Sequence, residues 1–217
     1  MTNDRECRAF SFEVRAEHDE QHGNFITGTP IVFDQKTDMG WYEETIARGA
    51  LDETNLKDVR FLVGHNTSMI PLARSRNNNE NSTMQMMVTD QSMNIRVNLD
   101  TENNAEARAL YSAVKRGDMT GMSFMFVVDK DSWDDIDSDY PKRTITSIRT
   151  VLEVSAVAFP AYPQTSIQAA SEDGTLDSAH ASLESARKQA EEERQRLAED
   201  ERRTAALERL NNLIGGN

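Results

Sequence analysis

Short segments with apolar residues at every second position limit this chain to a body built mainly of β-strands. Segments 84–88 and 95–99 both show this alternation, and the polar run 90–94 separates them. Alternation places one set of side chains on one face of a strand, so the pair predicts a hairpin. Segments 10–14 and 25–33, joined by a polar loop, predict a second hairpin.

Further strands are predicted at 60–63, 122–128, 144–148 and 151–159, with an exposed aspartate-rich loop over 129–139. Helices are fewer. Asn103 and Gly117 bound a predicted helix over 103–116, and residues 43–53 predict a short one. Many short strands with few helices indicate a mainly β, α+β fold, arranged as a small barrel or sandwich with peripheral helices.

The last part of the chain differs in composition. Thirteen of the twenty residues from Glu184 to Arg203 are charged, and neither glycine nor proline interrupts them. We therefore predict a body over residues 1–170 and a charged helical tail over 171–217. A weak coiled coil and a solvated single helix both fit the tail.

The composition narrows the classes of function. The net charge of −13 disfavours direct binding of nucleic acid. Cys7 is the single cysteine, so an intrachain disulfide cannot form. The sequence contains neither a signal-peptide core nor a stretch of membrane-spanning length, which predicts a protein that stays in the cell producing it.

Four histidines supply the candidates for a general base. His65 directly follows a short apolar strand and a glycine, which places it at the rim of a sheet; a purely structural histidine would occupy the same position. His18 and His22 bracket an acidic run that resembles a zinc-binding helix. The run lies in a predicted hairpin loop, however, and its glutamate is not where a metalloprotease has it.

Two further residues are candidates for chemistry. Ser123 lies where Gly121 leads into an apolar strand, and it points away from the face formed by Phe124. This position suits a nucleophile near backbone amides, and it equally suits a buried structural serine. Glu153 lies in an otherwise apolar strand, which is costly unless it is paired. His65 and Arg149 are the competing partners.

These segments, taken in order, resemble the tailed-phage prohead protease family, which is distantly related to the herpesvirus assemblins. The resemblance covers most of the body and departs from the family at PLAR (71–74), where a glycine often follows the leucine. The matching segments are GTPIVF (28–33), EETIARGAL (43–51), LVGHN (62–66), RGDMTGMSF (116–124), LEVS (152–155) and PAYP (160–163).

The resemblance implies a herpesvirus-protease type of β-barrel and a serine endopeptidase that needs no cofactor or metal. Ser123 would be the nucleophile and His65 its base, and Glu153 would replace the third group, a histidine in the herpesvirus relatives. The implied substrates are the scaffolding portion of the major capsid protein and the protease itself. The implied location is the immature prohead in the cytoplasm of the bacterial host, and we expect a homo-oligomer.

Two rival functions belong to other classes. A non-enzymatic capsid scaffolding protein would use the body to bind capsid subunits and the helical tail to drive assembly. A metal hydrolase would use His18 and His22. A Ser123→Ala variant tests the first rival, and a chelator tests the second.

Overall fold

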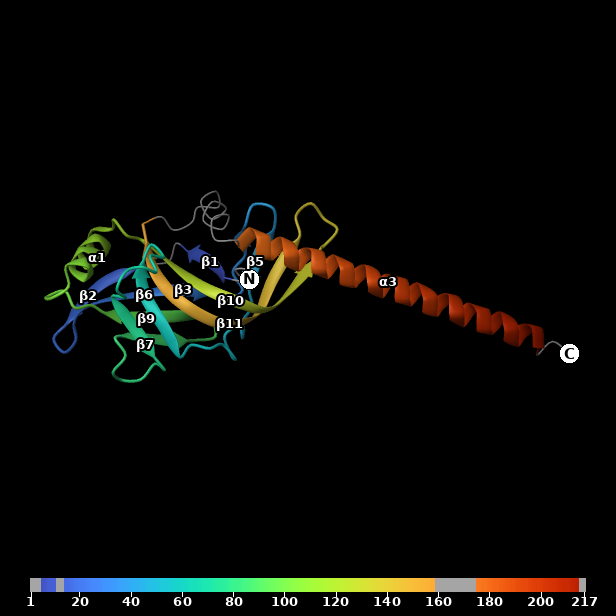
Figure 1. Cartoon of the computed structure of the whole chain (residues 1–217), viewed down its shortest axis with the longest axis horizontal. Helices are drawn as coiled ribbons and strands as arrows, with labels where there is room; N and C mark the ends of the chain where they lie inside the picture. Colours follow the sequence, from blue (N-terminus) through green and yellow to red (C-terminus); the bar gives the residue numbers. More distant parts are fainter. Residues whose placement is uncertain (1–4, 11–13, 159–174, 215–217) are drawn as a thin grey trace.

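The computed structural model describes residues 5–10, 14–158 and 175–214. These residues form two β-sheets with helix α1 beside them, and the long helix α3 projects from one end (Figure 1). The mainly β fold that the sequence predicts is therefore confirmed. Within the described residues neither strand order returns to its first strand, so the two sheets stay open and the predicted barrel is not confirmed.

The larger sheet has seven strands and is organised around one long strand, β11. The first part of β11 pairs in parallel with β5, and its last part pairs in parallel with β6. Along its other edge β11 pairs with β10, which in turn pairs with β1. The strands are β1 (Arg5–Phe10), β4 (Thr37–Asp38), β5 (Glu43–Ile46), β6 (Asp58–Val63), β7 (Ala73–Arg76), β10 (Gly121–Asp134) and β11 (Lys142–Val157).

The smaller sheet is a four-stranded antiparallel sheet in the order β2-β3-β9-β8. Its outer pairs are two hairpins, and β8 and β9 form the hairpin that the sequence predicts over 84–99. Its strands are β2 (Arg15–Asp19), β3 (Gly23–Val32), β8 (Met84–Val88) and β9 (Ser92–Asn98).

The hydrophobic core joins inward-facing side chains of both sheets. Phe124 and Phe126 of β10 are fully buried and stack with their ring centroids 4.6 Å apart, and Val97 of β9 belongs to the same cluster. Alternation in β10 therefore turns Ser123 and Met125 to the opposite face, as the sequence predicts.

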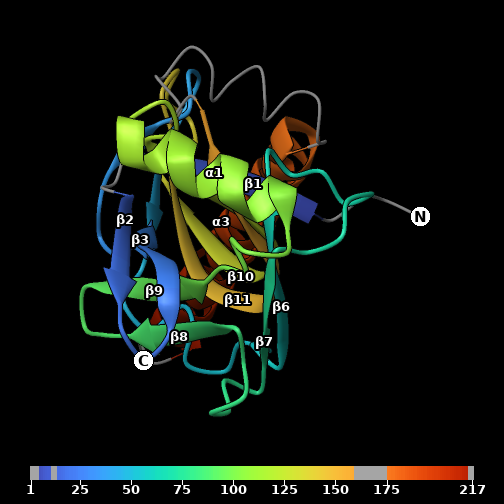
Figure 2. The same cartoon turned by 90° about the vertical axis from the view of Figure 1, so that its left-hand side faces the viewer.

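Helix α1 (Ala105–Arg116) adds Leu110 and Val114 to the core. Asn104 caps its first turn by accepting bonds from the amides of Glu106 and Ala107. The predicted cap, Asn103, is one residue early. Gly117 ends the helix with φ at 80°, a conformation that glycine adopts without strain. Figure 2 shows α1 lying across one end of the body, beside the loop that leaves β6.

Two expectations for the first part of the chain need correction. Residues 43–53 contain no helix: β5 covers Glu43–Ile46 and a series of turns follows. The predicted hairpin around the polar loop is present as β2 and β3, but its first strand begins at Arg15, and Phe10 instead lies in β1, which pairs with β10. Residue Phe12 and the PAYP segment lie outside the described residues.

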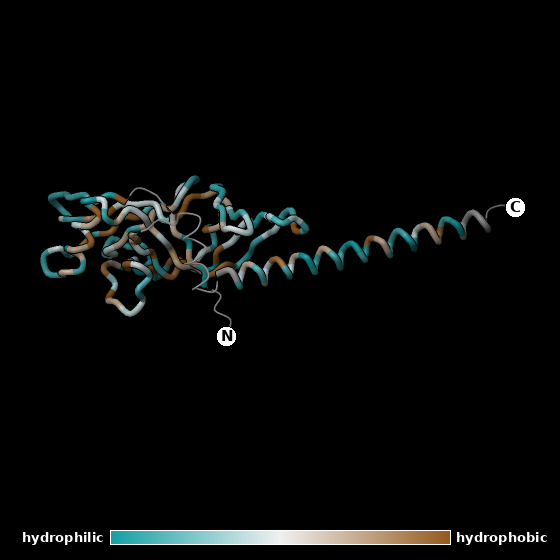
Figure 3. The backbone as a smooth tube through the Cα atoms, turned by 90° about the horizontal axis from the view of Figure 1, so that it is seen from above, coloured by the Kyte–Doolittle hydropathy of each residue, from teal (hydrophilic) through white to brown (hydrophobic). Residues whose placement is uncertain are grey.

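Helix α3 (Thr175–Ile214) begins against the body and then leaves it. Ala179 and Leu183 are buried, and the His180 ring stacks on Trp41 with the centroids 4.0 Å apart. The exposed stretch beyond is mostly hydrophilic (Figure 3). Neither α1 nor α3, as far as they are described, has the length and apolar character needed to cross a membrane.

Candidate active site

His65 lies at the end of β6, where the chain turns sharply. The Gly64 amide donates to the carbonyl of Ala156 at 3.0 Å, which fixes the end of β6 to the end of β11. Gly64 and His65 then both take left-handed backbone angles, with φ at 59° and 58°. A left-handed conformation is uncommon for a residue with a side chain, and here two successive ones turn the chain back across β11.

The imidazole of His65 meets the carboxylate of Glu153. Its Nδ1 lies 2.5 Å from Glu153 Oε1; the Glu153 side chain is 3% exposed and that of His65 is 24% exposed. A carboxylate can only accept, so Nδ1 carries the proton, and in a neutral ring Nε2 is then the basic nitrogen. Arg149, the competing partner, instead places its Nε 3.5 Å from Asp129.

Ser155 bonds both members of the His65–Glu153 pair. The sequence analysis did not identify this residue as part of the site. Its hydroxyl donates to Glu153 Oε2 at 2.5 Å and accepts from the backbone amide of His65 at 3.1 Å. Ser155 is fully buried. Its position two residues after Glu153 could have indicated it, because residues 153 and 155 lie on the same face of a strand.

Ser123 lies directly opposite Ser155 in the antiparallel pair of β10 and β11. Opposed residues on such strands have Cβ atoms about 5 Å apart and share a face, so Ser123 lies one strand away from the Glu153 group. Its side chain is buried, and its hydroxyl donates to the carbonyl of Arg8 at 2.8 Å. In this structure the hydroxyl is therefore directed at β1 and not at the imidazole.

A buried charge network holds β1 in place beside β10. The Arg8 guanidinium bonds both carboxylate oxygens of Glu44 and also reaches Glu6, 2.6 Å away. Arg143 bonds Glu6 through two nitrogens, at 2.9 and 3.0 Å. Burial by itself would raise the pKa of Glu6, but Arg8 and Arg143 outweigh it and lower this pKa to about 2. The network fixes the Arg8 carbonyl that Ser123 contacts.

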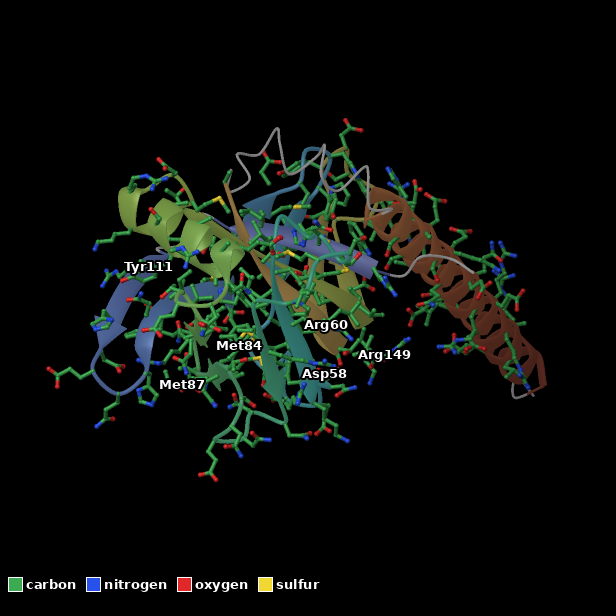
Figure 4. The ribbon with its side chains drawn as sticks, turned by 60° about the vertical axis from the view of Figure 1, so that its left-hand side comes forward. Asp58, Arg60, Met84, Met87, Tyr111 and Arg149 are labelled. Atoms are coloured by element: carbon green, nitrogen blue, oxygen red, sulfur yellow. The ribbon has the colours of Figure 1, made fainter. Side chains whose placement is uncertain are left out.

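A small cavity of about 180 Å³ opens on the same face of the sheet. Glu153, Met125, Leu62 and Arg60, from three adjacent strands, contribute to its lining. Figure 4 labels Asp58 and Arg60 on β6, and Arg149 farther along the sheet. The carboxylate that holds the imidazole is therefore reached from an open cavity, although Ser123 is covered.

The other candidate histidines lie elsewhere. His18 in β2 contacts Asn24 at 2.9 Å, and His22, in the following turn, contacts Asp19 at 3.2 Å. Among the residues with described positions, no group of three or more His, Cys, Asp or Glu side chains could hold a metal ion. The bonding of His18 and His22 to different neighbours gives the metal-hydrolase alternative no support.

The sequence comparison gives the class of this protein, which is a serine protease. The family model for caudovirus prohead serine proteases matches residues 10–178. The chain belongs to that family, and it is a capsid maturation protease of phage. This result confirms the family that the sequence segments suggested.

Two other comparisons complete the findings. The structure resembles that of the capsid assembly protease gp21 of bacteriophage T4, with 13% sequence identity and a TM-score of 0.37. The match covers 71% of this chain and 99% of the phage T4 chain. A search of curated proteins found no match.

Proposed function

We propose that His65, Ser123 and Glu153 are the catalytic residues of this protease. The observation that carries the proposal is the bond between His65 Nδ1 and Glu153, at 2.5 Å. It leaves Nε2 as the base that accepts the Ser123 proton while Ser123 attacks a peptide carbonyl. The protonated imidazole then gives this proton to the leaving amine, and water hydrolyses the acyl-enzyme.

The reaction requires the Ser123 hydroxyl to turn away from β1. Rotation about the Cα–Cβ bond to another staggered position exchanges the Arg8 carbonyl for the neighbouring strand that carries Glu153 and Ser155. Because Ser123 is only 1% exposed, binding of substrate also has to uncover it. We infer that the structure represents a resting arrangement of the site.

The substrates that fit this family are the scaffolding portion of the major capsid protein and the protease itself. We propose that cleavage takes place inside the immature prohead, in the cytoplasm of the bacterial host, by an enzyme that assembles as a homo-oligomer. The division into a body and a helical tail is part of the proposal. The exposed part of α3 would carry the enzyme into the particle and be removed later by self-cleavage.

Co-expression with the capsid subunit tests the catalytic residues. Wild type should shorten the subunit, as measured by mass spectrometry of intact proteins, and Ser123→Ala should leave it at full length. Ser132→Ala is a matched control, because Ser132 lies in the same strand and is exposed. Processing by Ser123→Ala at the wild-type rate would overturn the assignment of Ser123.

The same experiment separates an enzyme from a scaffold. A Ser123→Ala chain should still assemble with capsid subunits into proheads, as seen by electron microscopy, while processing stops. A chain truncated after Arg194 tests the tail: it should still cleave peptides but enter proheads poorly. Normal packaging of the truncated chain would overturn the role of the tail and leave the catalytic residues unaffected.

A further inference from the structure

A second cavity, of about 410 Å³, lies between α1 and the loop that carries His65. Ala109 and Ala113 of α1 contribute to one wall, and Val63, Asn66 and Met69 form the other. Figures 2 and 4 both show α1, marked by Tyr111 in Figure 4, beside the end of β6 from which this loop leaves. The cavity is thus next to the proposed base along the chain and in space.

The wall on the β6 side is a tightly bonded turn. The amide of Asn66 donates to the Val63 carbonyl at 3.2 Å, and the amide of Met69 donates to the Asn66 carbonyl at 3.2 Å. The Val63 amide in turn donates to the Met69 sulfur at 3.4 Å. His65 lies within this turn, so a group seated in the cavity presses on the residues that fix its position.

The lining favours an uncharged, apolar group. Ala109 and Ala113 are one helical turn apart on the same side of α1, and their small side chains leave room above them. Met119 supplies a flexible thioether that adapts to different shapes, and Met69 adds apolar surface from the turn. Among the described residues of the lining, Glu106 is the charged one, and it would repel an acidic group.

Met69 also lines the smaller cavity over Glu153. The two cavities therefore share this side chain as a lining residue. An extended peptide bound at the Glu153 face would pass Met69 and place a side chain in the space beside α1. This shared lining residue, next to the proposed base, favours a peptide substrate as the occupant.

We propose that the cavity between α1 and the His65 turn is a subsite for a large apolar side chain of the substrate, such as leucine, isoleucine, methionine or phenylalanine. The proposal rests on the proposed function and adds a substrate class to it. Seating such a side chain helps to hold His65 in place, so the preference should appear in kcat as well as in KM.

The test is to fill the cavity. Ala113→Leu adds a branched side chain where the substrate group would lie, and leucine keeps the helix stable. Ala105→Leu is the matched control, because Ala105 is exposed on α1 and does not line the cavity. The full chain and both variants are incubated with a mixture of peptides from a digested proteome, and mass spectrometry identifies the cleaved bonds.

The wild type and Ala105→Leu should show large apolar residues enriched at one position relative to the cleaved bond. For Ala113→Leu, kcat/KM for those peptides should fall about tenfold or more relative to peptides with alanine there. An unchanged profile in Ala113→Leu, or a wild-type profile without apolar enrichment, would overturn the subsite. If Ala113→Leu alters the oligomeric state in sedimentation but not the profile, the occupant is another copy of the chain and the subsite is overturned.

The controls separate this proposal from the proposed function. Cleavage that persists in Ser123→Ala, or a wild type that cleaves no peptide, overturns the catalytic assignment and the subsite with it. Cleavage that depends on Ser123 but is indifferent to the substitution at Ala113 overturns the subsite alone.

Discussion

His65 and Glu153 are 88 residues apart in the sequence, yet His65 Nδ1 lies 2.5 Å from Glu153 Oε1. The parallel pairing of β6 with the last part of β11 produces this contact, because it sets Arg60 opposite Glu153 and lets His65 turn back over the strand. The carboxylate is buried and the imidazole is partly exposed. This asymmetry keeps the pair together and leaves the ring accessible to a reacting group.

Replacing Glu153 with glutamine should change the tautomer of His65. The amide group of glutamine can donate to Nδ1, which would move the ring proton to Nε2 and block its function as a base. We expect kcat for peptide cleavage to fall by about 100-fold or more, and by less than in Ser123→Ala. Steady-state kinetics measures this, with Asp129→Asn as an exposed control. A Glu153→Gln variant with the wild-type kcat would remove Glu153 from the catalytic group.

Replacing Ser155 with alanine should misplace the proposed catalytic pair, His65 and Glu153, without touching the substrate. The change removes the bond to Glu153 and leaves the partly buried amide of His65 without that acceptor. A loss of about 1–3 kcal/mol in positioning corresponds to a fall in kcat of about 5- to 150-fold, with little change in KM. Nitrogen NMR of the His65 ring should report a shifted tautomer balance.

Ser147→Ala is the control for that measurement, because Ser147 lies in the same strand and its hydroxyl contacts Asp129 and not the His65–Glu153 pair. An unchanged kcat and an unchanged His65 spectrum in Ser155→Ala would assign Ser155 a role in packing only.

Local patterns predicted the elements that depend on neighbouring residues. Alternation gave the β8–β9 hairpin and the face of Ser123, and the charged run gave α3, because period and composition act within one segment. The segment 43–53 does not form the predicted helix, because its first residues pair as β5 with β11. That strand lies about a hundred residues away in the sequence, so the local pattern does not show the pairing. Glu44 is buried there beside Arg8 and Arg143, and neither partner is visible from the local sequence.

The same limit applies to the site. A single strand pattern shows that Glu153 needs a partner, but it does not choose between His65 and Arg149. The choice follows from the register between β6 and β11, which is a property of the whole sheet. The contact of Ser123 with the Arg8 carbonyl has the same origin, since the pairing of β1 with β10 joins segments more than a hundred residues apart.

The pKa of Glu6 predicts how the fold responds to acid. This pKa is about 2 in the folded protein against an ordinary value of 4.5, so the folded state binds the proton less readily than the unfolded state. The resulting stability is present above pH 4.5 and is lost as the pH falls from 4.5 toward 2. The difference corresponds to about 3 kcal/mol. Urea unfolding at pH 7 and pH 3 should show about 2 kcal/mol of this loss, because pH 3 lies between the two pKa values.

The variant Glu6→Gln should lose most of this dependence on pH. It will be less stable than wild type at pH 7, because Arg8 and Arg143 lose a carboxylate partner. The gap between the two proteins should then narrow at pH 3. An equal gap at both pH values would show that Glu6 does not titrate as described.

The two ends of α3 should contribute differently to stability. Leu183 is buried against the body at 2% exposure, whereas Leu197, on the same helix, is 53% exposed. Leu183→Ala removes buried apolar contacts, so the free energy of unfolding should fall by about 2 kcal/mol or more. Leu197→Ala makes the same chemical change in solvent and should alter it by less than about 0.5 kcal/mol.

Chemical denaturation followed by tryptophan fluorescence is suited to both, because Trp41 stacks on His180 and Trp133 bonds Ser182. Equal, small effects of the two substitutions would mean that the whole of α3 is a detachable tail, and a large effect of Leu183→Ala alone would make its first turns part of the folded body.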